Sequence, residues 1–156
     1  MVEKKIMVDL SHINKKGFFE ALDIVPKNIP VAVTHTGVSG VYEIWRNIDD
    51  EQIKAIANTG GTVGVIYCPR FLTNTSTTCS VDKIIDHFAH IIKVAGEDVP
   101  TLGSDYDGLI NLPREFKDIT YQPILVQKML DRGWSDERIK KILGLNFLRV
   151  IKGVAP

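Results

Sequence analysis

The sequence IMVDLSH, residues 6–12, decides how the rest of the chain is interpreted. Ile6, Met7, Val8 and Leu10 form a nearly continuous apolar run, and the segment closes on polar residues that include His12. A run of this kind is typical of a strand buried on both faces of a parallel sheet. His12 then stands at the C-terminal end of that strand.

Three further segments repeat this arrangement of an apolar run that ends in a polar group. VAVTH (31–35) ends in a histidine, TVGVIY (62–67) in a tyrosine, and VPTLGSDYDG (99–108) contains two aspartates near its end. We predict four parallel strands in sequential order, near residues 6–11, 31–34, 62–66 and 100–104. The active site of a parallel α/β sheet lies at the C-terminal edge of its strands, which is where these polar groups are expected.

Helical periodicity and capping residues follow each predicted strand. The expected helices span residues 14–25, 49–61, 80–96, 121–133 and 135–154, with Ser80 and Ser135 as N-caps, Gly96 as a C-terminal stop, and a long loop at 68–80. Alternating strands and helices predict an α/β fold of four sequential βα units with an extra C-terminal helix. Four such units form a small open sheet or half of a TIM-type (β/α)8 barrel.

The composition of the sequence limits which classes of protein and of partner are expected. The 156 residues fit a single domain, and the formal net charge of zero gives no electrostatic reason to expect nucleic acid or an anionic membrane as a partner. No apolar run of 18 or more residues is present, so no membrane span is expected. Cys68 and Cys79 do not make a disulfide framework, and we expect a reduced, cytoplasmic protein.

Four polar residues at the predicted sheet edge are candidates for chemistry. His12 and His35 end consecutive strands, and two neutral imidazoles beside the carboxylate of Asp105 suit zinc or another divalent transition metal. Arg46 follows the second strand and can bind a substrate carboxylate through two parallel hydrogen bonds. A strand-ending histidine can instead simply hydrogen-bond a loop.

Other histidines and the tryptophans receive structural interpretations. His87 and His90, at positions i and i+3 of a helix, are expected to contact a loop or a sheet edge rather than a metal. Trp45 and Trp134 are expected to be packing residues.

Several motifs in order resemble one known family. These are VDLSH, PVAVTHTG, RNIDD, GGTVGVIY, DHFAHIIKVAG, GSDYDG and RGWSDERIKKILGLNFLRV. Together they resemble the second half of the membrane (renal) dipeptidase family, whose members are zinc metallopeptidases with an amidohydrolase-like barrel. The resemblance covers the whole chain, and it implies that residues 1–156 correspond to strands five to eight of that barrel.

The resemblance also implies roles for individual residues. His12 and His35 match the histidines that bind one zinc of a binuclear pair, and Arg46 matches the arginine that holds the C-terminal carboxylate of the dipeptide. Asp105 matches an aspartate that sits beside the metals and helps to handle protons. The third strand departs from the family, because IYCPRFL stands where asparagine and aromatic residues are usual, so a substrate contact by Tyr67 does not carry over.

The first half of the family's site has no counterpart in this sequence. The HxD metal ligands, the bridging glutamate and a further substrate-binding histidine are all missing, so the chain can hold at most one ion in a partial site. We therefore expect no dipeptidase turnover from the chain alone. Two interpretations remain: a zinc-dependent dipeptidase half completed by a separate N-terminal chain, and a non-catalytic truncated homologue that folds and self-associates.

A half barrel also predicts an interaction surface. It leaves two strand edges unpaired and exposes the inner face of the sheet, so the chain is expected to form a symmetric homodimer or to bind the missing half. About half of seven apolar strand residues are expected to be exposed on that face: Val8, Leu10, Val31, Val33, Val63, Val65 and Leu102.

Overall fold

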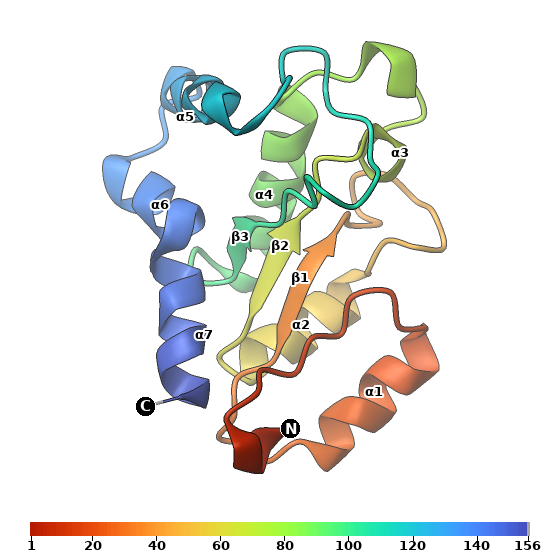
Figure 1. The fold of residues 1–156 in the computed structure, drawn as a ribbon, viewed down its shortest axis with the longest axis vertical. Coiled ribbons are helices and arrows are strands. Elements are labelled where there is room, and N and C mark those ends of the chain that lie inside the picture. Colours follow the sequence, from red (N-terminus) through yellow and green to blue (C-terminus); the bar gives the residue numbers. More distant parts are fainter. Residues whose placement is uncertain (156) are drawn as a thin grey trace.

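The computed structural model describes residues 1–155 (for Ser76, the backbone only), in which helices pack behind and beside a small parallel sheet (Figure 1). The strands are β1 (Ala32–Thr36), β2 (Thr62–Val65) and β3 (Pro100–Leu102). The helices are α1 (Lys15–Ile24), α2 (Asp50–Asn58), α3 (Pro69–Leu72), α4 (Asp82–Ala95), α5 (Gln122–Asp131), α6 (Asp136–Lys140) and α7 (Asn146–Val154). Among these described residues, no helix is long and apolar enough to cross a membrane.

The sheet has the order β1-β2-β3 with both pairs parallel, which confirms the predicted direction and sequential order for these strands. The prediction of a fourth strand at residues 6–11 is wrong. That segment lies parallel to β1 but pairs through the single bridge between Asp9 and Ala32.

The side chain of Asp9 explains why the first segment does not continue as a strand. Ala32 N donates to Val8 O at 3.0 Å and Leu10 N donates to Ala32 O at 2.9 Å, as in a parallel ladder. The next donor, Thr34 N, bonds instead to Asp9 Oδ1 at 3.0 Å. The carboxylate thus takes the place of a backbone acceptor, and the ladder ends.

The pairing of β1 with β2 also contains an irregularity beside the predicted site. Val33 pairs with Val63 and Thr36 pairs with Val65, so two residues of β1 oppose the single residue Gly64. A Cβ at Gly64 would lie 2.0 Å from Thr34 O, so only glycine permits this approach. The bulge changes the direction of the β1 side chains next to His35.

The helix ends follow the predicted capping residues at most positions. Ser135 accepts from Arg138 N, and Gly96 ends α4 with φ 89°. Ser80 is not the N-cap of α4, because the helix begins one residue later, after Val81; Ser80 Oγ accepts from Asp82 N instead. The expected loop 68–80 contains the short helix α3.

The predicted helix 135–154 is divided into two. A π-helical turn at Lys141–Leu145 separates α6 from α7, and Gly144 within it has non-helical backbone angles. Glycine destabilises a helix interior, which accounts for a break at this position.

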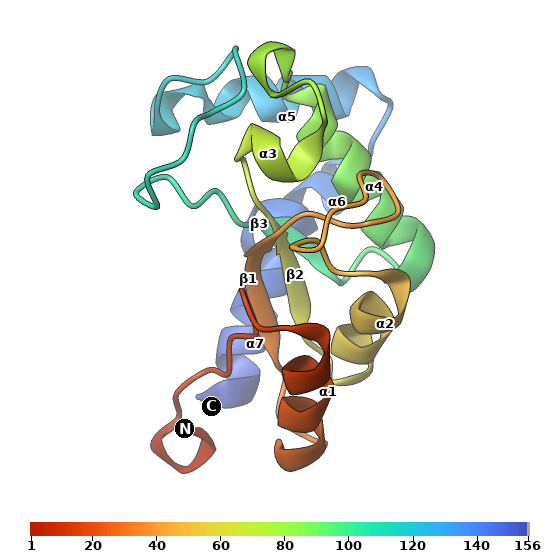
Figure 2. The same ribbon diagram turned by 90° about the vertical axis from the view of Figure 1, so that its right-hand side faces the viewer.

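The core lies between the sheet and the helices α2 and α4, which cover the same face (Figures 1 and 2). On the β3 side, α7 and the preceding π-turn pack against the strands, and Thr101 Oγ1 donates to Ile142 O. The expected exposed inner face is therefore wrong for the strand residues named above. Five of them are at most 5% exposed, and Val8 and Leu102 are partly buried against the core.

Candidate functional site

His12 and His35 meet at the C-terminal end of the strands, as the sequence predicts. Their rings are 4.6 Å apart between centroids, and the two Nε2 atoms are 2.6 Å apart. His12 has a left-handed backbone with φ 66°, which turns the chain at the end of the first segment. The two imidazoles therefore direct the same ring atom to one point.

Asp9 holds the two histidine-bearing segments together. Its Oδ1 accepts hydrogen bonds from Ser11 N, Ser11 Oγ and Thr34 N at 2.8–3.0 Å, and its Oδ2 accepts from Thr34 Oγ1 at 2.6 Å. Desolvation alone would raise the pKa of Asp9, but these hydrogen bonds outweigh it and lower the pKa below its usual range. Sequence reasoning missed this role, although the polar cluster that follows the first apolar run was its visible signal.

The polar groups of the site form one directed chain of hydrogen bonds. Arg46 Nη2 lies 2.6 Å from His12 Nδ1. Because a guanidinium only donates, His12 Nδ1 is the acceptor of this hydrogen bond. His12 then carries its proton on Nε2 and donates to His35 Nε2. His35 Nδ1 in turn faces Thr34 Oγ1 at 3.0 Å, and Thr34 donates to Asp9. The chain runs from a cation to a carboxylate.

The surroundings of His12 lower its pKa and so favour the neutral imidazole. Partial desolvation lowers the pKa of His12 first, and the nearby His35 and the positive charge of Arg46 lower it further. A neutral imidazole is the form that can offer a nitrogen lone pair to a metal.

The two histidines fit half of a metal site. Two converging imidazole Nε2 atoms are donors that zinc prefers, and they come from different segments that Asp9 holds in place. Among the described residues, no group of three or more His, Cys, Asp or Glu side chains is placed to hold a metal ion.

The observed hydrogen bonds also bear on how a metal can bind. Both Nε2 atoms must offer lone pairs, so the proton of His12 must then lie on Nδ1. A protonated Nδ1 cannot accept from Arg46, so metal binding through both rings requires Arg46 to leave His12.

Asp105 lies on the same edge, after β3. Its backbone is left-handed with φ 58°, and its charge is near enough to His12 to oppose the lowering of the histidine pKa. Gly108 N donates to Asp105 O at 3.0 Å, and a Cβ at Gly108 would lie 2.2 Å from Asp105 Oδ1. The glycine therefore gives this carboxylate its room.

Arg46 stands between two aromatic rings. Its guanidinium carbon lies 5.1 Å from the centroid of Trp45 and 5.8 Å from that of Phe71. Trp45 is 87% exposed, so the prediction that it is a packing residue is wrong. Trp134 is partly buried against the core, as predicted. Beside Arg46, a cavity of about 220 Å³ opens next to His12.

The helix histidines and Tyr67 have structural roles. His87 of α4 is fully buried; its Nδ1 accepts from Val38 N at 2.9 Å, and its Nε2 faces Leu72 O at 3.3 Å. His90 Nε2 bonds to Asp50 Oδ1 at 2.6 Å, at the start of α2. The predicted loop contact is thus confirmed for His87, whereas His90 contacts a helix instead. Tyr67 is buried with its hydroxyl on Gln122, and burial raises its pKa.

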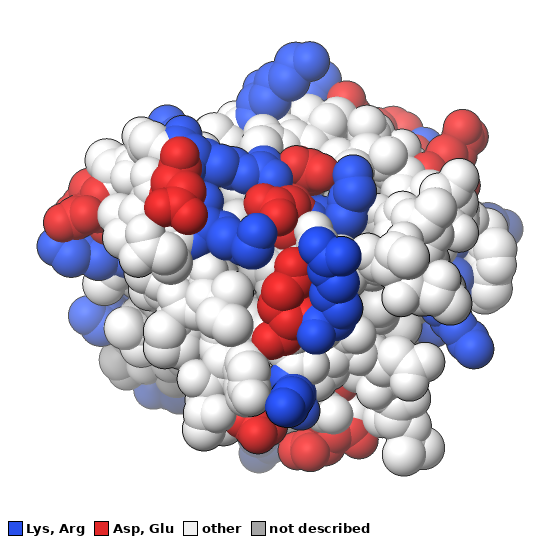
Figure 3. Space-filling model, turned by 90° about the horizontal axis from the view of Figure 1, so that it is seen from above, with Lys and Arg blue, Asp and Glu red and all other residues white. Residues whose placement is uncertain are grey.

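Charges on the face seen from above are of both signs and lie interspersed (Figure 3). Several ion pairs join α4 to α5. Asp82 and Asp86 of α4 pair with Lys128 of α5 and with Arg132, the residue that follows α5, at 2.6–3.2 Å, which holds the two helices together.

Comparison with known proteins identifies relatives of the chain. Residues 1–156 match the membrane dipeptidase family, peptidase family M19, over their whole length. The chain is 36% identical over 149 residues to an uncharacterized dipeptidase of Schizosaccharomyces pombe and 30% identical over 149 residues to the dipeptidase tcpJ of Claviceps purpurea. These matches cover 94% and 96% of this chain but 35% of each relative.

Solved structures give the same result. A metallo peptidase from Rhodobacter sphaeroides, crystallised with a phosphinate mimic of the dipeptide L-Ala-D-Ala, superimposes with a TM-score of 0.91 at 29% identity. The superposition covers 98% of this chain and 44% of that one. The chain thus spans about a third to a half of the length of these relatives.

Proposed function

Because the chain belongs to the membrane dipeptidase family, we propose that it is the C-terminal half of a zinc-dependent dipeptidase. In this proposal, residues 1–156 form one domain that supplies strands five to eight of a (β/α)8 barrel, and protein outside these residues supplies the rest. The observation that carries the proposal is the convergence of His12 and His35 Nε2 atoms beside Arg46. The segment Val8–Leu10, which meets β1 through the single bridge between Asp9 and Ala32, then represents the first strand of this half.

Each site residue has a separate task in peptide hydrolysis. His12 and His35 would hold a zinc ion, which supplies Lewis acidity toward the peptide carbonyl and toward a water molecule. Arg46 binds the C-terminal carboxylate of the dipeptide and so fixes the position of the peptide bond. Asp105 accepts a proton as water adds to the carbonyl carbon and passes it to the departing amine nitrogen when the C–N bond breaks.

Arg46 is held ready for its task by the hydrogen bond to His12. His12 and His35 could hold zinc through both Nε2 atoms only if the guanidinium left Nδ1 of His12, and a substrate carboxylate is a stronger acceptor for it than an imidazole nitrogen. Its stacking on Trp45 and Phe71 keeps it at the site during this exchange.

Two flanks of the molecule support the need for additional protein. On the side of the first segment, Met1, Ile6 and Ile24 are 52–83% exposed, and on the β3 side Leu145, Leu148 and Ile151 are 43–50% exposed. Exposed apolar side chains of this number are typical of an interaction surface. They lie at the two sheet edges that a complete barrel would cover.

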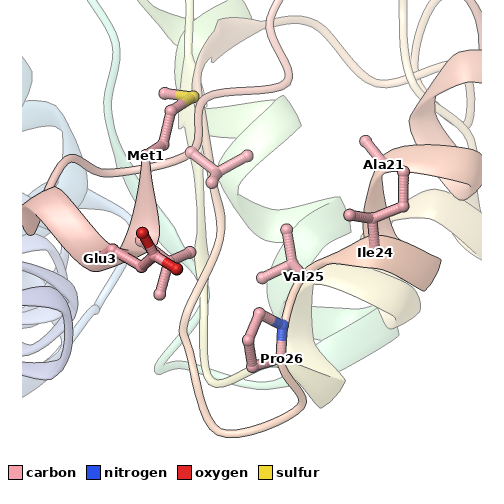
Figure 4. Close-up of a pocket in the computed structure, with 8 residues that line it drawn as sticks. Met1, Glu3, Ala21, Ile24, Val25 and Pro26 are labelled. Carbon is pink, nitrogen blue, oxygen red and sulfur yellow. The ribbon is translucent and has the colours of Figure 1, made fainter.

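The molecule also has two apolar hollows, one on the side of the first segment and one that reaches across the sheet from β1 to β3. The larger, about 630 Å³, lies between Met1 and Glu3 on one side and Ala21, Ile24, Val25 and Pro26 on the other (Figure 4). The second, about 420 Å³, is lined by Thr34, Thr101, Leu102, Leu143, Gly144, Phe147 and Leu148. Because the chain's own core buries the strand residues expected on the inner face, the flanks favour the missing half over a second copy as the partner.

The compartment belongs to the same proposal. Cys68 and Cys79 are both unpaired and buried, and burial raises the pKa of the Cys79 thiol to about 11. Two unpaired thiols support a reducing compartment such as the cytoplasm.

An assay by complementation tests the proposal. Purified chain is mixed, with zinc, with the part of the Rhodobacter sphaeroides metallo peptidase that it does not match, and dipeptide hydrolysis and molar mass are measured. We expect no turnover from either part alone, turnover from the mixture, and loss of turnover with His12→Ala or His35→Ala. Ile24→Lys and Leu148→Lys are expected to weaken association, whereas Ile119→Lys, an exposed apolar residue away from both flanks, is the matched control.

Three outcomes would contradict the proposal or part of it. Turnover by the chain alone that His12→Ala and His35→Ala abolish would refute the need for further protein. A mixture that associates but stays inactive would favour the non-catalytic homologue. A stable dimer of the chain that excludes the second part would favour self-association.

A further inference from the structure

We infer that Trp45 and Ile13 form the subsite for the side chain of the dipeptide's C-terminal residue, and that this subsite selects apolar side chains. The inference rests on the proposed function, because it takes Arg46 as the group that binds the C-terminal carboxylate. It adds the substrate class, which neither the residues of the metal site nor the relatives assign to this chain.

The first observation is that the indole of Trp45 is exposed and does not pack in the core. Trp45 is 87% exposed, whereas Trp134, the second tryptophan, packs against the core. The ring of Trp45 contacts the guanidinium of Arg46, whose central carbon lies 5.1 Å from the ring centroid. A large apolar ring left in solvent beside a substrate-binding cation is typical of a recognition site rather than of packing.

The second observation is the reach from Arg46. In a C-terminal residue, the side chain and the carboxylate leave the same Cα, so a carboxylate on Arg46 places the side chain within a few ångströms of the guanidinium. The cavity of about 220 Å³ there is lined by His12, Ile13, Asn14, Lys15, Trp45 and Arg46. His12 belongs to the metal side, so the side chain must lie against the other lining residues.

The third observation is that the polar groups of this cavity already have partners. Lys15 Nζ is paired with Asp49 at 2.7 Å and with Glu51 at 2.8 Å. The side chain of Asn14 accepts from Gly17 N at 2.9 Å as the N-cap of α1. Ile13, 40% exposed, and the indole of Trp45 are the lining surfaces that a ligand can cover without breaking these bonds.

A charged or strongly polar side chain would gain little at this place. The ammonium of Lys15 and the side-chain oxygen of Asn14 are already engaged, whereas a leucine or phenylalanine side chain covers the indole and Ile13 directly. We therefore expect dipeptides with an apolar C-terminal residue to bind more tightly than those that end in glycine.

The test uses the fluorescence of Trp45 in the full chain. Trp134→Phe leaves Trp45 as the remaining tryptophan, and circular dichroism checks that this variant folds. The variant is titrated, with zinc, with glycyl-leucine, glycyl-glycine and glycyl-leucinamide, which lacks the carboxylate. Calorimetry repeats the titrations with the variants Trp45→Ala and Arg46→Met. It is needed because Trp45→Ala removes the fluorophore that the first titration uses.

We expect glycyl-leucine to change the emission of Trp45 and to bind about fivefold or more tightly than glycyl-glycine. Trp45→Ala should reduce the ratio of the two affinities to nearly one, and Arg46→Met should weaken both ligands. If carboxylate-dependent binding through Arg46 is seen without a preference for leucine, or if Trp45→Ala keeps the preference, the subsite is refuted and the proposed function stands. If binding needs neither the carboxylate nor Arg46, the proposed substrate site fails and the subsite fails with it.

Discussion

The four histidines of the chain form two pairs, and the two regions that hold them treat an imidazole in opposite ways. In α4, His87 uses both ring nitrogens on backbone groups of Val38 and Leu72, and His90 is bonded to Asp50. At the edge of the sheet, His12 and His35 direct their Nε2 atoms at each other. His87 and His90 therefore hold neighbouring segments to α4. His12 and His35 can instead turn their Nε2 atoms to a metal without breaking the fold.

The backbone around each pair produces this difference. A helix places His87 and His90 along one surface, where packed loops approach and supply partners. His12 lies in a left-handed turn and His35 lies beside a bulge. Asp9 accepts hydrogen bonds from Ser11 N and Thr34 N, the residues that precede the two histidines. A strand end leaves side chains pointing beyond the sheet, and this is why chemistry gathers there.

The largest expected effect concerns His87 and pH. Burial lowers the pKa of His87 to about 4, whereas the unfolded chain keeps the ordinary value of 6.5. Between these values the unfolded state binds more protons, so the stabilising effect is complete above pH 6.5 and is lost as the pH falls toward 4. The free energy of unfolding should fall by about 3 kcal/mol over this range, as measured by urea denaturation.

His87→Gln is the control for this effect. It retains an acceptor and a donor but cannot titrate, so the loss of stability between pH 6.5 and 4 should largely disappear. An unchanged pH dependence in this variant would show that His87 is not the group responsible.

The second prediction concerns the metal affinity of the other pair. His12→Ala or His35→Ala removes one of two ligands, and zinc affinity measured by calorimetry should fall roughly a hundredfold or more, beyond what loss of an outer partner usually causes. His90→Ala, from the helix pair, should leave it unchanged. Equal losses from all three variants would erase the distinction between the two regions.

These two predictions show what the sequence could and could not supply. The apolar runs that end in His12 and His35 predicted both their common edge and their partnership, because parallel strands align their C-terminal ends. The period of α4 correctly separated His87 and His90 from the site. Hydrophobic periodicity reports elements and their ends, and the positions of both histidine pairs follow from it, whereas their roles rest on side-chain chemistry and on the family resemblance.

The remaining features depend on individual side-chain contacts. The polar cluster that contains Asp9 is visible in the sequence, but its hydrogen bond from Thr34 N, which ends the ladder, is not. The exposure of Trp45 depends on how its loop is folded. Periodicity does not encode such contacts.

A third prediction sharpens the account of the site. Arg46→Met removes the donor that holds the proton of His12 on Nε2, so the isolated chain should bind zinc several-fold more tightly. By reciprocity, acetate, which can take up Arg46, should strengthen zinc binding in the natural chain and not in the variant. Weaker zinc binding by Arg46→Met would contradict the competition for His12.

The smallest expected effect is at the outer histidine of α4. The bond between His90 and Asp50 lies at the surface, where Asp50 is 52% exposed, so His90→Ala should cost less than about 1 kcal/mol in the free energy of unfolding. Chemical denaturation at pH 7 measures it. A loss as large as that expected for His87 would show that the two helix histidines are equally structural.

The most direct test of the central claim is a zinc titration followed by the imidazole nitrogen resonances of all four histidines in long-range ¹H–¹⁵N NMR spectra. The account predicts that the Nε2 resonances of His12 and His35 shift together to metal-bound values and that those of His87 and His90 stay in place. Zinc that leaves His12 and His35 unshifted, or that shifts His87 or His90 first, would contradict it.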